Sequence, residues 1–284
     1  MTEPQFGESY RHAETRVVHA AGVDLAYREL GPRTGVPLVA LTHLGANLDG
    51  WDHRVIDGLA RDRRVVAVGY RGVGDSAGRV RDSIDEMAQD AIAVIRALGL
   101  DRVDLFGLSM GGMVAQAVIA QAPELVERLI LAGSGPAGGP GLTAMTGVMV
   151  RSTVRATVTF TDPRVLLFFT RTAAGKTAAR DYLSSLSERG ADREKAVPLG
   201  VLRAQLAAVH AWGSQEPADL SRYSGPTLIV HGDGDRMVQQ ENADALARRL
   251  PGAVVSLFSD SGHGVVFQNH RAFVADAGAF LRRA

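Results

Sequence analysis

A serine stands between glycines in the stretch LFGLSMGGMVAQAV, residues 105–118. It follows an apolar run typical of a buried strand and precedes a glycine-rich apolar run typical of a buried helix. A strand-to-helix turn this sharp strains the backbone at its apex, Ser109, and glycines at positions 107 and 111 permit it because they carry no Cβ. The hydroxyl then lies at a helix N-terminus, where the helix dipole stabilises developing negative charge. The pattern predicts a nucleophilic serine rather than a simple turn residue.

The bulk composition limits the classes of protein to consider. The chain has 284 residues, of which 46% are apolar and 22% charged, and its 31 Lys plus Arg balance 31 Asp plus Glu. A neutral surface gives no general attraction to nucleic acid or to an anionic membrane, so we expect a small molecule as the partner. The sequence has no cysteine, which excludes disulfides, thiolate metal sites and a cysteine nucleophile.

The sequence carries no recognisable targeting or membrane segment. The N-terminal stretch MTEPQFGESYRHAETR is polar and lacks the apolar centre of a secretory signal. No apolar run approaches the length needed to cross a bilayer, so we expect a cytoplasmic protein. Metal signatures such as H-E-x-x-H are absent, and we expect neither a metal nor another cofactor.

Short β-branched runs recur along the chain and predict a sheet. Residues 15–20 and 23–30 predict a hairpin around Ala21-Gly22, and the later runs are almost continuously apolar, as in strands covered on both faces. The later predicted strands are residues 37–43, 63–70, 102–109, 128–134, 226–232 and 253–259. Helical patterns lie between them, so we predict an α/β fold with a mostly parallel, eight-stranded sheet flanked by helices.

Two helical patterns are especially regular. Residues 83–98 place apolar side chains on one face, with Ser83 and Glu86 predicting a capping box and Gly99 predicting the residue after the helix end. Residues 271–283 repeat the apolar pattern near the end of the chain.

One region contains no convincing strand. It runs from residue 135 to 217 and opens within the glycine- and proline-rich stretch GSGPAGGPG, residues 133–141. Because it lies between two predicted strands, we interpret it as a helical insertion over one edge of the sheet. The remaining residues, 1–134 and 218–284, form the predicted core domain.

The stretch GYRGVGDSA, residues 69–77, fits the pattern G-x-G-x-x-A that cradles a dinucleotide elsewhere. The next predicted helix begins only near Ser83, so no helix N-terminus lies at these glycines. We interpret the stretch as a tight turn.

With its G-x-S-x-G run at residues 107–111 in a strand–turn–helix context, the chain resembles the α/β-hydrolase family from about residue 16 to 283. The resemblance implies that residues 135–217 form the family's helical cap, inserted after the sixth strand. It also implies the order serine, acid, histidine along the chain. Asp235 in GDGDRMV matches the acid, with Asp233 as the alternative, and His263 in SGHGVVF matches the base.

The resemblance further implies an oxyanion hole made of two backbone amides. Met110, directly after the serine, is expected to give one of them. The second is expected from THLGANLDGW, residues 42–51, where Gly45 is the first candidate and Leu44 the second. The family usually has a glycine after the histidine, and this chain has leucine there. His43 is expected to brace this loop rather than to react.

Few substrate contacts can be named from the sequence. Leu44, His210 and Trp212 are the candidates to contact a substrate, although packing explains His210 and Trp212 at least as well. Phe168 and Phe169 are expected to be core residues.

These features together predict a serine hydrolase that cleaves a carboxylic ester or lactone of a small, largely apolar substrate through an acyl-enzyme on Ser109. Alternatives are thioester hydrolysis, carbon–carbon bond cleavage and perhydrolysis of the haloperoxidase type. A small-molecule receptor or sensor with slow hydrolysis is an alternative of another class, since fold does not fix function. The sequence leaves open whether the protein is a monomer or a homodimer.

Overall fold

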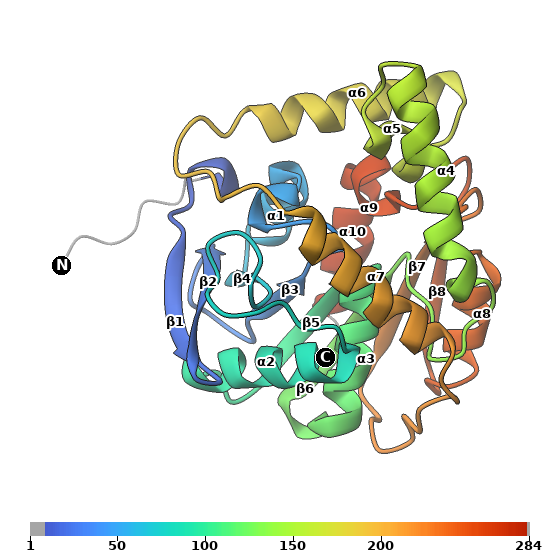
Figure 1. The fold of residues 1–284 in the computed structure, drawn as a ribbon. Coiled ribbons are helices and arrows are strands. Elements are labelled where there is room, and N and C mark those ends of the chain that lie inside the picture. The colour runs from blue at the N-terminus through green and yellow to red at the C-terminus, as the bar shows by residue number, and fades with distance from the viewer. Residues whose placement is uncertain (1–8, 283–284) are drawn as a thin grey trace.

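An eight-stranded sheet forms the centre of the computed structural model, which describes residues 9–282 (Figure 1). The first eight residues of the polar N-terminal stretch, and residues 283–284 of the predicted core and last helix, lie outside the described residues. The strand order is β1-β2-β4-β3-β5-β6-β7-β8. The strands are β1 (Arg16–Ala20), β2 (Val23–Leu30), β3 (Leu38–Leu41), β4 (Val65–Val68), β5 (Val103–Leu108), β6 (Val126–Ala132), β7 (Thr227–Gly232) and β8 (Val254–Phe258).

The pairing of the strands confirms the predicted mostly parallel sheet. β1 and β2 form an antiparallel hairpin, and β2 pairs antiparallel with β4. The other neighbouring strands are all parallel. The turn of the hairpin lies at Ala21 and Gly22, whose φ angles of 50° and 78° match a two-residue turn with both central residues left-handed.

Helices cover both faces of the sheet. On β5, Phe106 contacts Phe273 of α10, whereas the backbone of Gly107 approaches Gly111 of α3, so these helices lie on opposite faces. α2 packs beside α3, and α1 packs beside α10 (Figure 1). The α-helices are α1 (His53–Leu59), α2 (Ile84–Ala97), α3 (Met110–Gln121), α4 (Met145–Val158), α5 (Pro163–Phe168), α6 (Ala173–Ser187), α7 (Leu199–Gly213), α8 (Glu241–Ala247), α9 (Val265–Gln268) and α10 (His270–Leu281).

The ends of α2 test the two predicted caps. Gly99 follows the helix with a φ of 68° and donates to the carbonyl of Arg96, which confirms its predicted position. The predicted capping box is wrong, because the side chain of Ser83 makes no capping hydrogen bond. Glu86 Oε1 instead lies 3.6 Å from Arg81 Nη1.

The register of the parallel strands brings their carboxyl ends to one edge of the sheet. Leu41 at the end of β3 pairs with Gly107 of β5, and Leu108 pairs with Ala132 at the end of β6. Gly232 at the end of β7 pairs with Phe258 at the end of β8. The loops that follow these strands therefore begin side by side, which is the arrangement that brings distant polar residues together.

Residues 135–217, called the helical segment below, connect β6 to β7. The segment contains α4, α5, α6 and α7, and its described residues include no strand. In Figure 1, α6 runs along the upper edge of the molecule and α7 crosses its front.

Glu194, between α6 and α7, ties the helical segment to the sheet. Its carboxylate is buried and accepts hydrogen bonds from the backbone N–H groups of Leu48 and Asp75. Burial raises the pKa of Glu194. These contacts join the segment to the loop after β3 and to the turn after β4.

The glycine-rich stretch 69–77 forms a compact turn. Gly72 and Gly74 have positive φ angles, and the Gly72 N–H donates to the carbonyl of Ala77. α2 begins at Ile84, so no helix N-terminus lies at these glycines. The expected tight turn is confirmed.

Among residues 9–282, no helix has the length and apolar character needed to cross a membrane.

Candidate active site

Ser109 lies at the sharp turn between β5 and α3. Its φ of 56° and ψ of −118° are strained for a residue with a Cβ, as predicted. A Cβ at Gly107 would lie 2.3 Å from the Gly111 carbonyl oxygen, and a Cβ at Gly111 would lie 2.1 Å from the Leu41 carbonyl oxygen. Both separations are far below contact distance, so glycine is required at each position for the strand and helix to meet.

Three side chains from different strand ends form one hydrogen-bonded chain. His263 Nε2 lies 2.8 Å from Ser109 Oγ, and His263 Nδ1 lies 2.8 Å from Asp235 Oδ2. A carboxylate only accepts hydrogen bonds, so Nδ1 donates to Asp235 and Nε2 of the neutral ring accepts from the serine hydroxyl. All three residues are buried. We refer to Ser109, His263 and Asp235 as the triad.

The carboxylate of Asp235 is fixed by the backbone that follows it. Its Oδ1 accepts the N–H groups of Met237 and Val238 at 2.8 and 3.0 Å, which leaves Oδ2 for His263. Asp233 is exposed and accepts from the Ser261 N–H instead. The structure therefore brings Asp235, not Asp233, to the histidine.

Met110 and Gly45 are the two residues expected to give the oxyanion donors. Met110 is the first residue of α3, and N–H groups in the first turn of a helix have no intrahelical acceptor. Gly45 has a φ of 74°, and its N–H donates to Gln205 Oε1 at 2.8 Å. Leu44 is buried beside it. The Gly45 amide is thus held by a side chain of α7.

His43 lies in the same loop and is buried. Its Nδ1 is 2.9 Å from the Leu44 carbonyl oxygen, so the ring bridges its own loop as expected. Burial lowers the pKa of His43 to about 4, and the nearby His263 and Arg164 act in the same direction. The ring is therefore neutral at physiological pH.

Phe168, at the end of α5, brings the helical segment onto the triad. Its carbonyl accepts the Gly264 N–H at 2.8 Å, and its ring centroid lies 5.9 Å from that of His263. Phe168 and Phe169 are both buried, as predicted, but Phe168 also borders the triad.

The triad is closed off in this arrangement. Ser109 and His263 each expose only 2% of their surface. The crevice beside the imidazole is too narrow to hold a water molecule; it is lined by His43, Leu108, Phe168, His263, Gly264 and Phe267. Ser109 and His263 therefore have little contact with solvent in this structure.

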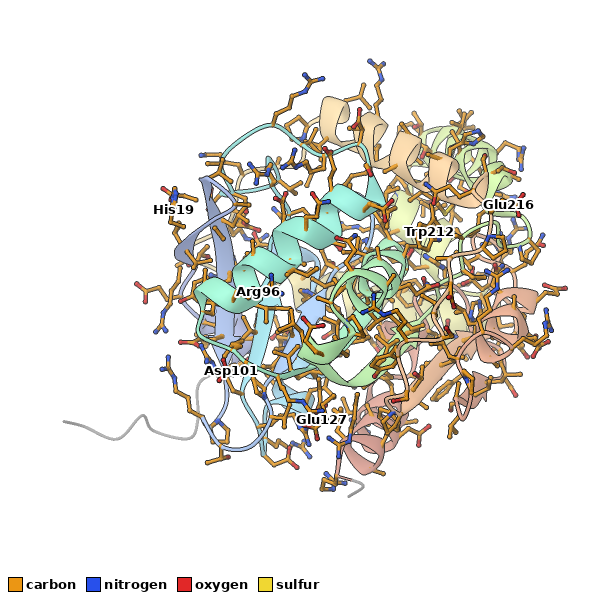
Figure 2. All side chains as sticks on the ribbon, turned by 90° about the horizontal axis from the view of Figure 1, so that it is seen from below. His19, Arg96, Asp101, Glu127, Trp212 and Glu216 are labelled. Atoms are coloured by element: carbon orange, nitrogen blue, oxygen red, sulfur yellow. The ribbon has the colours of Figure 1, made fainter. Side chains whose placement is uncertain are left out.

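His210 and Trp212 lie toward the end of α7. His210 is exposed. Trp212 is buried, and its Nε1 donates to the Gly135 carbonyl oxygen at 3.2 Å. Figure 2 shows Trp212 within the body of the molecule and Glu216 at its edge. Neither His210 nor Trp212 has a hydrogen bond or ring contact with the triad among the described residues.

Gln205 contacts the loop that carries the expected second oxyanion donor, and the sequence did not indicate this contact. It occupies a buried position of α7 and meets Gly45, which lies 160 positions earlier in the chain. Helical periodicity predicts a buried face, but a glutamine on that face carries no local pattern that names its partner.

The described residues contain no group of three or more His, Cys, Asp or Glu side chains arranged to hold a metal ion.

A parallel sheet with a serine elbow and a Ser–His–Asp chain at its carboxyl edge defines a class of enzyme. The chain belongs to the alpha/beta hydrolase fold family, whose model matches residues 36–270. It is similar to an alpha/beta hydrolase fold protein from Chitinophaga pinensis, with a TM-score of 0.92 and 28% identity over 98% of this chain and 100% of that one.

Two relatives of the chain illustrate the different activities that similar proteins have. The chain is 27% identical to 2-hydroxymuconate semialdehyde hydrolase of Pseudomonas sp., over 95% of this chain and 94% of that protein. It is 30% identical to an sn-1-specific diacylglycerol lipase of Mus musculus, over 77% of this chain and 72% of that protein. Both are hydrolases, and their names differ in the substrate.

Proposed function

We propose that the protein is a serine hydrolase that cleaves a carboxylic ester or lactone of a small, largely apolar substrate. The observation that carries this proposal is the hydrogen-bonded chain from Ser109 through His263 to Asp235. A serine becomes an effective nucleophile when a correctly oriented base removes its proton, and this chain supplies both the base and its orientation.

In the first step, Ser109 Oγ attacks the carbonyl carbon while its proton passes to His263 Nε2. The electron pair of the carbonyl moves to the oxygen, and the Met110 N–H donates to this oxyanion together with a second amide, that of Gly45 or Leu44. Asp235 stabilises the imidazolium that forms. His263 then returns the proton to the leaving alcohol oxygen, which leaves an acyl group on Ser109.

In the second step, His263 removes a proton from water, and the resulting hydroxide attacks the acyl carbon. The same amides bind the second oxyanion. Its collapse breaks the bond to Ser109 Oγ, which regains a proton from His263. The product is a carboxylic acid.

The helical segment, residues 135–217, is the proposed cap over a core formed by residues 1–134 and 218–284. Its Phe168 ring borders the imidazole, and Phe267 and Leu108 lie in the same crevice. Aromatic and aliphatic walls favour an apolar acyl group. The cap has to move before a substrate enters, because the triad is buried.

A carbon–carbon bond hydrolase is the second candidate. It is favoured by the similarity to the 2-hydroxymuconate semialdehyde hydrolase along nearly the whole chain. The same serine, histidine and oxyanion donors serve acyl transfer from carbon when the leaving carbanion is stabilised.

The proposal is tested by comparing the wild-type protein with Ser109→Ala on p-nitrophenyl acetate and butyrate. We expect repeated turnover by the wild type and loss of turnover in the variant. A matched control is Ser134→Ala, because Ser134 is also buried near α3 but lies outside the triad. Equal turnover by the wild type and Ser109→Ala contradicts the proposal.

A further inference from the structure

Gln205, in the middle of α7, contacts the loop that carries the expected second oxyanion donor. Its side chain is fully buried, and its Oε1 accepts the Gly45 N–H at 2.8 Å. Because the partner is an N–H donor, the acceptor has to be the oxygen of the carboxamide. The orientation of the Gln205 amide is therefore fixed by chemistry.

The other end of the same carboxamide has no partner. Nε2 carries two N–H donors, is buried, and makes no hydrogen bond within the described residues. An unsatisfied buried donor costs about 1–3 kcal/mol, and nearly all buried polar groups in proteins are paired. A partner that arrives with the substrate accounts for this free donor.

Two contacts link Gln205 and its helix to the loop that packs against the nucleophile elbow. The loop that contains Gly45 begins at Thr42, and Thr42 packs against α3. A Cβ on Gly111 of α3 would lie only 2.7 Å from the Thr42 carbonyl oxygen. Leu202, one turn before Gln205, reaches to 3.2 Å from the position of a Cβ on Gly45. Nε2 shares a carbon atom with Oε1, so it lies close to the same loop.

The hydrogen bond to Gln205 also bears on the oxyanion hole itself. The Gly45 N–H is already directed at Oε1, and one N–H does not make two full-strength hydrogen bonds. A second donor to the oxyanion then comes from a neighbouring group: the Leu44 N–H is one candidate, and the unpaired Nε2 of Gln205 is another.

We propose that Gln205 Nε2 donates to the oxyanion, with Gly45 acting through it as a positioning residue. This inference rests on the proposed hydrolase function. When the carbonyl electron pair moves to oxygen, Met110 N–H and Gln205 Nε2–H stabilise the charge. The hydrogen bond from Gly45 to Oε1 orients the carboxamide and polarises it toward stronger donation. Glutamine side chains are among the groups that form oxyanion holes.

The consequence is a residue of the helical segment that acts in the chemical step. The acceptor is the reacting oxygen of any ester, so the effect of Gln205 is independent of the acyl chain. Its effect falls on kcat rather than on KM, because the oxyanion exists only after the substrate is bound.

The test compares Gln205→Met and Gln205→Glu with the wild type on p-nitrophenyl acetate and butyrate. Methionine has a similar length and no hydrogen-bond donor, while glutamate retains an acceptor for Gly45 and lacks the N–H. The matched control is Arg203→Met, an exposed position on the same helix. Circular-dichroism melting checks that each variant is folded.

For both Gln205 variants we expect kcat to fall by about 10²–10³, with KM within about threefold of the wild type. Phenylboronic acid forms a tetrahedral adduct with the serine, so its inhibition constant should rise in both variants. Arg203→Met should match the wild type.

Three results overturn this inference. An increase in kcat on removing Gln205 means that its oxygen blocks the Gly45 donor. An unchanged kcat means that the backbone amides suffice, and a change confined to KM means that Gln205 only shapes the pocket. In each case Ser109-dependent turnover by the wild type persists. Absence of turnover by the wild type is a separate result, and it would contradict both the proposed function and this inference.

Discussion

Ser109 Oγ and His263 Nε2 lie 2.8 Å apart although 154 positions separate them in the chain. The parallel register of β3, β5, β6, β7 and β8 produces this contact, because it aligns the carboxyl ends of strands that are distant in sequence. The strained turn at Ser109 raises the hydroxyl from β5, and the loop after β8 brings the imidazole to it. The site thus follows from the topology of the sheet.

Asp235→Asn is expected to lower kcat by about 10⁴ with little change in fold, because an amide no longer fixes the imidazole in the required tautomer. Asp233→Asn is the matched control, two positions away and exposed, and should retain activity. Steady-state kinetics on p-nitrophenyl butyrate measures both. A larger loss in Asp233→Asn than in Asp235→Asn contradicts the geometry of the site.

Gly111→Ala is expected to destabilise the protein by more than about 3 kcal/mol, because its Cβ would lie 2.1 Å from the Leu41 carbonyl oxygen in a rigid backbone contact. Urea unfolding gives the free energy. Gly200→Ala in α7 is the control, since nothing lies within 4 Å of its Cβ position, and a better helix former there should stabilise by up to about 1 kcal/mol. Equal effects of the two substitutions argue against the tight elbow.

His43 should make stability depend on pH. Burial lowers its pKa from 6.5 to about 4 in the folded protein. Between these values the unfolded chain binds a proton that the folded protein does not, so the free energy of unfolding falls as the pH falls through this window.

The measurement is urea unfolding of the wild type and His43→Gln at pH 7 and pH 5. Glutamine removes the titration, so the wild type should lose about 2 kcal/mol more than the variant between these pH values. His19→Gln makes the same substitution at an exposed histidine and is the control for the effect of the substitution itself. Identical pH dependence in wild type and His43→Gln rules out this role for His43.

The strands and the serine elbow could be predicted because local chemistry determines them. A strand buried on both faces has to be almost wholly apolar, and the strained turn requires glycine at positions 107 and 111. The predicted capping box at Ser83 does not form. Helical periodicity could not show this, because Glu86 lies near Arg81, and the apolar pattern of the helix says nothing about that contact.

Contacts between the helical segment and the core could not be predicted in the same way. Phe168 fits a core pattern, and only the folded chain shows that it also borders His263. Gln205 contacts Gly45, which lies 160 positions earlier in the chain, and the sequence around either residue contains no pattern that predicts this contact. Asp235 and Asp233 differ by two positions, and it is the backbone N–H groups of Met237 and Val238 that fix Asp235 in place.

Labelling with a fluorophosphonate, followed by mass spectrometry of the tryptic peptides, tests the activation of Ser109 most directly. The probe reacts with a serine only when a base has made it nucleophilic. We predict one adduct, on Ser109, whose rate of formation falls at least about 100-fold in His263→Gln. Labelling of a different residue, or an unchanged rate in His263→Gln, would contradict the account.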